Sequence, residues 1–146
     1  MLRGRHPATV DAKGRLKIPV AFKDILDERY GPEFYVTSLD GQYARIYPFA
    51  EWQKIEDKLA AIPSMNEAKM KLLDRTNYWG QQVRMDAQGR ILVPSQLRES
   101  AAVRGEVAVM GYLTYLDVWN PQRFAEHLEN NPITLEDRKA LSELDI

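Results

Sequence analysis

Apolar and polar residues alternate along two stretches of the chain, and a turn-like phrase interrupts each stretch. The first stretch has apolar residues at positions 8, 10, 16 and 18, and the second at positions 83, 85, 91 and 93. Alternation of this kind predicts strands with one buried face. Each stretch is therefore expected to form a hairpin around its turn.

The interrupting phrase occurs twice, as residues 11–19 (DAKGRLKIP) and as residues 86–94 (DAQGRILVP), at an offset of 75 residues. Asp, Ala, Gly, Arg and Pro are shared, and a repeat at a fixed offset indicates two copies of one structural unit. Aspartate suits the first position of a type I turn, and glycine suits the position that needs a left-handed backbone. The structural turn residues are therefore expected to be Asp11, Gly14, Asp86 and Gly89.

The same order of elements follows each phrase. Pro19 and Pro94 fit the first turn of a helix, and second strands are expected at 34–37 and 107–110. Third strands are expected at 44–48 and 116–121, each leading into another helix. Residues 64–67 (SMNE) match a capping box that predicts a helix between the copies, and Thr134 is expected to cap a short helix in the tail.

This order divides the chain into repeat 1 (1–62), a linker helix (63–80), repeat 2 (81–130) and a C-terminal tail (131–146). A unit of about 60 residues buries little core by itself. The two repeats are therefore expected to pack together and to exchange strands.

Composition excludes several classes of site. The chain of 146 residues is 45% apolar and 28% charged, as in folded proteins, and it has no cysteine and only two histidines. No metal site, cofactor or catalytic group is expected, because turn chemistry accounts for Asp11 and Asp86 and no glycine-rich phosphate loop is present. No apolar run approaches a membrane span, so a cytoplasmic protein without a membrane partner or a small-molecule substrate is expected.

Charge is unevenly distributed, although the net charge is only −1. Residues 1–23 carry +5 and residues 81–105 carry +2, whereas residues 24–62 carry −4 and residues 106–146 carry −5. Positive charge therefore gathers around the repeated phrase. Taken alone, this pattern favours basic residues that keep exposed strands soluble, and a nucleic-acid partner is the alternative interpretation.

Basic residues around the phrases are the candidate DNA contacts, and they are Arg3, Arg5, Lys13, Arg15, Lys17 and Arg90. Arginine pairs bidentately with guanine, whereas lysine acts as a point charge. Arg15 is therefore expected to read a base, and the other cations of repeat 1 are expected to contact phosphates. Arg3 and Arg5 are expected to precede the first strand and to reach the same surface.

The second copy lacks most of this basic set. The 75-residue offset replaces the cations at positions 3, 5, 13 and 17 by Tyr78, Gly80, Gln88 and Leu92. Repeat 1 is therefore expected to contact DNA, while repeat 2 mainly supports folding and subunit packing.

Several motifs together resemble the MraZ family, small bacterial regulators built from two AbrB-like (SpoVT-AbrB) units. These motifs are the opening residues 1–4 (MLRG), the two DAxGR phrases, Tyr47-Pro48 before Trp52, and residues 64–66 (SMN). The resemblance covers about residues 1–128. It implies a mainly β fold with flanking helices, a swapped-hairpin (double-split) AbrB-like β-barrel made from two internal repeats.

The resemblance also implies a function. It implies a ring-shaped homo-oligomer, associated with the nucleoid, that binds short direct repeats of double-stranded DNA in its own upstream region. The implied action is regulation, usually repression, of the division and cell-wall gene cluster. The alternative is an antitoxin-like module that uses the same barrel to cover a protein partner. Tyr78, Trp79 and Tyr112 are expected either at subunit interfaces or as caps of the barrel core.

Overall fold

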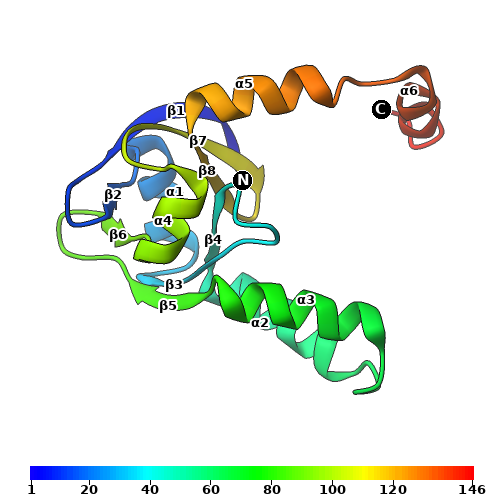
Figure 1. Ribbon diagram of the computed structural model, residues 1–146, viewed down its shortest axis with the longest axis horizontal. Helices are drawn as coiled ribbons and strands as arrows, with labels where there is room; N and C mark the ends of the chain where they lie inside the picture. Colours follow the sequence, from blue (N-terminus) through cyan, green and yellow to red (C-terminus); the bar gives the residue numbers. More distant parts are fainter.

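The strands of both repeats form one antiparallel sheet that curls into a nearly closed barrel (Figure 1). The computed structural model describes all residues, 1–146. Repeat 1 contributes β1 (Leu2–Val10), β2 (Arg15–Lys17), α1 (Val20–Arg29), β3 (Glu33–Thr37), β4 (Ala44–Pro48) and α2 (Phe49–Ala60). Next come α3 (Glu67–Tyr78), β5 (Gln81–Arg84), β6 (Arg90–Leu92), α4 (Ser95–Ala101), β7 (Gly105–Leu113), β8 (Leu116–Trp119), α5 (Pro121–Asn130) and α6 (Leu135–Ser142).

Strands are exchanged between the repeats, as the sequence predicts. The order in the sheet is β5-β3-β4-β8-β7-β1-β2-β6, so four of the seven neighbouring pairs join one repeat to the other. The longest pairing joins β1 to β7, from Leu2 opposite Leu113 to Val10 opposite Gly105. Each repeat therefore completes its hydrogen bonding with strands of the other repeat.

The hairpin predicted at the first turn is confirmed, whereas the strands that flank the second turn do not pair with each other. β1 and β2 share a single register pair, Val10 opposite Leu16, and β5 is not paired with β6. β2 pairs with β6 as well as with β1. The β2–β6 ladder has three register pairs, so each of these short strands pairs along its whole length with the equivalent strand of the other repeat.

The two repeats are related by an approximate two-fold axis that runs between β2 and β6. The amide of Ile18 donates to the carbonyl of Gly89 at 3.0 Å, and the amide of Val93 donates to the carbonyl of Gly14 at 2.9 Å. These bonds are equivalent under the 75-residue offset, and they hold each turn against the strand of the other repeat.

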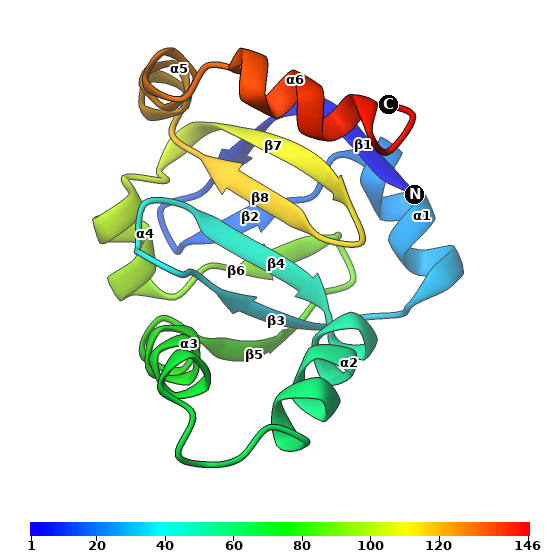
Figure 2. The same ribbon diagram turned by 90° about the vertical axis from the view of Figure 1, so that its right-hand side faces the viewer.

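The core fills the inside of the barrel. Leu16 and Ile91 point inward from the paired strands and are fully buried. They belong to a cluster of 21 buried residues drawn from both repeats. Helices α1 and α4 lie at opposite ends of the barrel (Figure 2) and insert Phe22 and Leu97 into the same cluster.

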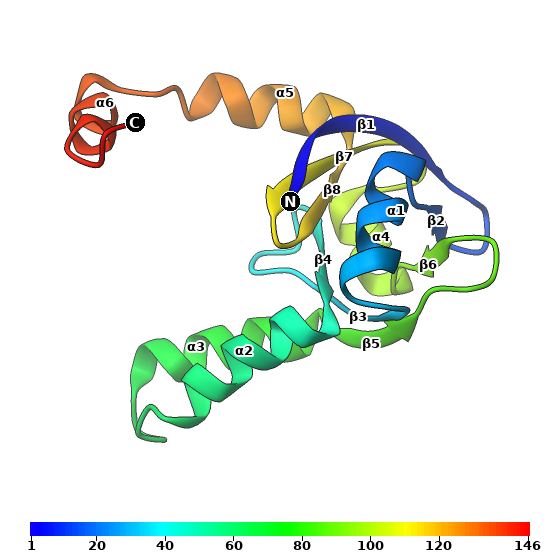
Figure 3. The same cartoon turned by 180° about the vertical axis from the view of Figure 1, so that it is seen from behind.

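Two helical arms project from one side of the barrel, away from the two turns (Figures 1 and 3). One arm is formed by α2 and α3, and the other by α5 and α6. The linker helix begins after Asn66, whose side chain accepts from the amide of Lys69 at 2.9 Å, so the cap is not at Ser64 as the SMNE motif suggests. The predicted cap at Thr134 is confirmed, and Asp137 completes a capping box. No helix is both long and apolar enough to cross a membrane.

Candidate nucleic-acid interface

The first turn is organised around the side chain of Asp11. Its Oδ1 accepts from the backbone amides of Lys13 at 3.0 Å and Arg15 at 2.9 Å. The amide of Gly14 donates to the carbonyl of Asp11 at 2.9 Å, and Gly14 has φ +86°, a backbone conformation that favours glycine. The roles expected for Asp11 and Gly14 within the turn are present in the structure.

The second turn repeats this geometry. Oδ1 of Asp86 accepts from the amides of Gln88 and Arg90, both at 2.9 Å. The amide of Gly89 donates to the carbonyl of Asp86 at 3.0 Å, and Gly89 has φ +74°. The shared Asp, Gly and Arg of the repeated phrase therefore build the same local structure twice.

Each aspartate also orients the arginine that follows it. Nε of Arg15 donates to Oδ2 of Asp11 at 2.8 Å, and Nε of Arg90 donates to Oδ2 of Asp86 at 2.7 Å. Each arginine thus binds its aspartate through Nε alone, which leaves the Nη groups of the guanidinium for another ligand. The Arg15 side chain is 33% exposed and that of Arg90 is 26% exposed, so both remain accessible.

These contacts shift the pKa of both aspartates. Hydrogen bonds from the backbone amides of Arg15 and Arg90 lower the pKa of Asp11 and Asp86, respectively, and the arginine side chains add to the effect. Both aspartates are therefore ionised at neutral pH. Because each Asp–Arg pair has no net charge, the pairs supply oriented donors, and the surrounding cations supply the positive potential.

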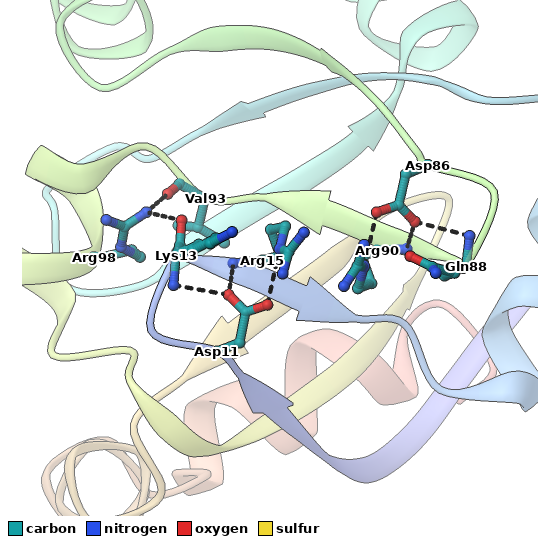
Figure 4. Close-up of polar contacts among 8 residues, drawn as sticks. All are labelled: Asp11, Lys13, Arg15, Asp86, Gln88, Arg90, Val93 and Arg98. Atoms are coloured by element: carbon teal, nitrogen blue, oxygen red, sulfur yellow. Dashed lines mark hydrogen bonds and ion pairs between the residues drawn. The ribbon is translucent and has the colours of Figure 1, made fainter.

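Arg15 and Arg90 lie close together between the two turns (Figure 4). In the β2–β6 ladder, Arg15 is opposite Leu92 and Lys17 is opposite Arg90. Because Leu16 and Ile91 point into the core, these four side chains share the outer face of the ribbon. The two repeats therefore present one joint surface.

The two lysines of this surface differ in their contacts. Lys13 is exposed in the first turn and its side chain makes no hydrogen bond or ion pair within the chain. Lys17 is also exposed, and its Nζ donates to the carbonyl of Gln88 in the second turn. Lys13 thus has a free ammonium group, whereas Lys17 already supports the other repeat.

Arg3 and Arg5 lie away from this surface. Both are exposed residues within β1, opposite Tyr112 and Met110 of β7, so the prediction that they precede the first strand is wrong. At about 3.3 Å per residue, the five residues from Arg5 to Val10 separate Arg5 from the turn by roughly 16 Å. β1 leads from the N-terminus, on the side that carries the helical arms, to the first turn (Figure 3). Arg3 and Arg5 therefore form a second basic patch.

Comparison with known proteins places the chain in a family. Residues 1–75 and 80–142 match the family model described as "MraZ protein, putative antitoxin-like". The chain belongs to the MraZ family. Its relatives include the transcriptional regulator MraZ of Acidobacterium capsulatum, which is 57% identical over 143 residues and 98% of both chains. The transcriptional regulator MraZ of Koribacter versatilis is 50% identical over 147 residues, the whole of both chains. A third, from Pseudomonas putida, is 35% identical over 122 residues, 82% of this chain and 80% of the relative.

The family match confirms the resemblance drawn from the repeated phrase, and with it the two-repeat, AbrB-like barrel. Relatives similar over nearly the whole length carry the name of a transcriptional regulator, a class of protein that is not enzymatic. MraZ-family membership therefore agrees with a site that holds oriented arginines.

Sequence reasoning missed one residue of this MraZ-family surface, Arg98 of α4. Its Nη1 donates to the carbonyl of Val93 at 2.7 Å and contacts the carbonyl of Lys13 at 3.4 Å (Figure 4). Arg98 stands one turn into α4, and the 75-residue offset aligns it with Lys23 of α1. The sequence signal that could have identified Arg98 is a basic residue four positions after each proline, Lys23 after Pro19 and Arg98 after Pro94.

Proposed function

We propose that the chain binds double-stranded DNA through the surface formed by the two turns and the β2–β6 ribbon. The observation that carries the proposal is the pair of arginines, Arg15 and Arg90, each fixed through Nε by its own aspartate with its Nη groups left over. Pre-oriented guanidinium groups lose little side-chain entropy on binding and suit bidentate recognition of a base edge or a phosphate.

A two-stranded ribbon fits the major groove of B-DNA, where guanine presents O6 and N7 to an arginine. We assign base readout to Arg15, with Arg90 beside it. Lys13 and Lys17 contact phosphates, because both are exposed on the same surface. Arg3 and Arg5 contact the DNA backbone beyond this groove, since they form a separate patch on β1.

The binding is unequally divided between the repeats. Arg15 is flanked by Lys13 and Lys17, whereas the equivalent neighbours of Arg90 are Gln88 and Leu92. Arg15 is also the more exposed of the two arginines, at 33% against 26%. The first repeat therefore contributes more of the binding free energy, and the second contributes Arg90 and the support of the first turn.

We further propose that the chain acts as a repressor, assembled as a ring-shaped homo-oligomer that binds short direct repeats in its own upstream region. The regulated genes are the division and cell-wall cluster, and the protein is cytoplasmic and associated with the nucleoid. The support is membership of a family whose members are named transcriptional regulators. A ring makes later contacts intramolecular, so a small basic surface on each subunit suffices for tight binding.

The test is a mobility-shift titration of the chain's own upstream region at several salt concentrations, with a shuffled fragment of equal composition as control. We expect saturable binding to the upstream fragment only. Its log–log salt slope should be about −0.9 for each phosphate contact. Equal binding to both fragments, or no shift at low salt, would refute sequence-specific DNA binding.

The second candidate function is an antitoxin-like module that covers a protein partner, and the description of the family model favours it. In that case the two arginines would bind carboxylates of the partner in place of DNA. Purified chain that binds no DNA but co-purifies from its host with one stoichiometric protein, lost on Arg15→Ala, would favour this alternative.

A further inference from the structure

We propose that Arg98 is a positioning residue that holds the first turn in its DNA-binding conformation. The inference rests on the proposed function, because the turn carries Lys13 and leads into Arg15. Nη1 of Arg98 donates to the carbonyl of Val93, which follows β6, at 2.7 Å, and makes a longer contact of 3.4 Å with the carbonyl of Lys13 in the turn. The guanidinium therefore ties the turn of repeat 1 to the body of repeat 2.

Gly14 makes this contact possible. A Cβ built on Gly14 would lie 1.5 Å from Nη1 and 2.2 Å from Cζ of Arg98, so the guanidinium occupies the space that any side chain at position 14 would need. The carbonyl of Gly14 simultaneously accepts from the amide of Val93 at 2.9 Å. Arg98 thus packs against the turn at the point where the two repeats are joined by backbone hydrogen bonds.

The second turn is held at the equivalent atom by a different residue. The carbonyl of Gln88 corresponds to that of Lys13 under the 75-residue offset, and it accepts from Nζ of Lys17. Lys17 belongs to the opposite repeat, as Arg98 does for the first turn. In both turns, therefore, a cation from the other repeat binds the same carbonyl.

The residues that bind this carbonyl in the two turns are not equivalent under the 75-residue offset. Leu92, the counterpart of Lys17, has no donor, so it cannot hold the first turn. Lys23, the counterpart of Arg98, pairs with Asp27 at 2.6 Å. Recurrence of the contact through different residues indicates that the carbonyl itself must be held, and Arg98 does this for the more basic of the two turns.

The test compares Arg98→Met, which keeps much of the aliphatic packing, with Arg138→Met, which removes the same charge from exposed α6. In DNA-free protein we expect the amides of Lys13 and Gly14 to exchange about tenfold faster in Arg98→Met, a loss typical of one charge-assisted hydrogen bond. The amides of Gln88 and Gly89 serve as internal controls and should not change. Adding Leu92→Lys to Arg98→Met places a lysine at the position equivalent to Lys17, which binds the second turn. The double variant should restore slow exchange of the amides of Lys13 and Gly14.

On the upstream fragment, Arg98→Met should weaken binding about tenfold while the salt slope stays unchanged, because a positioning residue neutralises no phosphate. Arg138→Met should bind within about twofold of the parent chain. A slope reduced by about 0.9 would make Arg98 a phosphate contact and overturn the inference. Unchanged exchange at Lys13 and Gly14 would overturn it as well.

The two readouts separate this inference from the proposed function. If the parent chain binds no DNA, the proposed function fails and positioning of a DNA-binding turn fails with it, while the exchange data still report whether Arg98 holds the turn. If the parent chain binds and Arg98→Met binds equally well, only the inference fails. Should Arg98→Met not fold, Arg98→Gln replaces it, because glutamine is polar but carries no positive charge and has a shorter side chain than arginine.

Discussion

Replacing Gly14 by alanine should destabilise the protein more than the same change at Gly89. Both glycines have positive φ, +86° and +74°, so alanine costs about 1–2 kcal/mol at either position from the left-handed backbone alone. At position 14 the new Cβ also displaces the guanidinium of Arg98 and breaks its bonds to two carbonyls, at a further cost of about 1–2 kcal/mol for a partly exposed group. The total for Gly14→Ala is therefore about 3 kcal/mol.

At position 89 the new Cβ would meet Cε of Lys23 at 2.9 Å. That atom lies near the end of a flexible side chain that can move while it keeps its ion pair with Asp27, so the cost should stay at about 1–2 kcal/mol. Urea unfolding followed by circular dichroism measures both values. In an Arg98→Met background, Gly14→Ala should cost no more than Gly89→Ala, because the displaced contact is already absent. Equal costs for the two glycines in the parent chain would refute the reasoning.

The remaining predictions concern acid stability, a buried ion pair and the salt dependence of binding. The pKa of Asp11 is lower in the folded state than its ordinary value of 3.8. The ionised carboxylate therefore stabilises the fold above pH 3.8, and this stabilisation should be lost as the pH falls through the folded-state pKa. Asp11→Asn should flatten this part of the pH profile of thermal unfolding. Asp117 of β8 accepts from Nε and Nη2 of Arg45 of β4 at 2.8 and 3.1 Å, and the two side chains are only 4% and 17% exposed. Asp117→Asn should therefore cost about 3 kcal/mol in urea unfolding, because it leaves the guanidinium of Arg45 without its charged partner; a loss below about 1 kcal/mol would contradict this. Lys13→Gln should reduce the salt slope of DNA binding by about 0.9 whereas Gln88→Ala should not, and equal slopes would remove Lys13 from the phosphate contacts.

Local structure was predictable because its causes are local. An aspartate three residues before a glycine, with an arginine next, contains all the groups that the turn uses, and both turns form as expected. Helix starts after Pro19 and Pro94 depend equally on adjacent residues. The linker cap was misplaced by two residues because Ser64 and Asn66 are both good capping residues, and only the backbone decides between them.

Pairing of the strands was only partly predictable. Alternation identifies which face of a strand is buried, but it does not identify every neighbour. β1 pairs with β2 as the predicted hairpin requires, and it also pairs along its whole length with β7, which the alternation does not indicate. Exchange of strands between the repeats is predictable for another reason, because a single repeat is too small to bury a sufficient core by itself. The position of Arg5 depended on this pairing, which extends β1 back to Leu2 and places Arg5 inside the strand.

The role of Arg98 was not visible in the sequence because its contact spans 85 positions and depends on strand exchange. A residue that holds a carbonyl in another repeat leaves no local pattern. The repeated phrase therefore specified the two turns and their arginines, while the joining of the turns into one surface came from tertiary structure.

The central claim is that the oriented arginines bind DNA, and the most direct measurement is a titration of the upstream fragment with Arg15→Ala beside Arg90→Ala. Both variants should keep the thermal unfolding profile of the parent chain within a few degrees, since each arginine lies on the outer face of the barrel. We predict that Arg15→Ala loses about 10- to 100-fold in affinity, equivalent to one lost bidentate contact, and that Arg90→Ala loses less. Folded Arg15→Ala that binds the fragment as tightly as the parent chain would contradict the account.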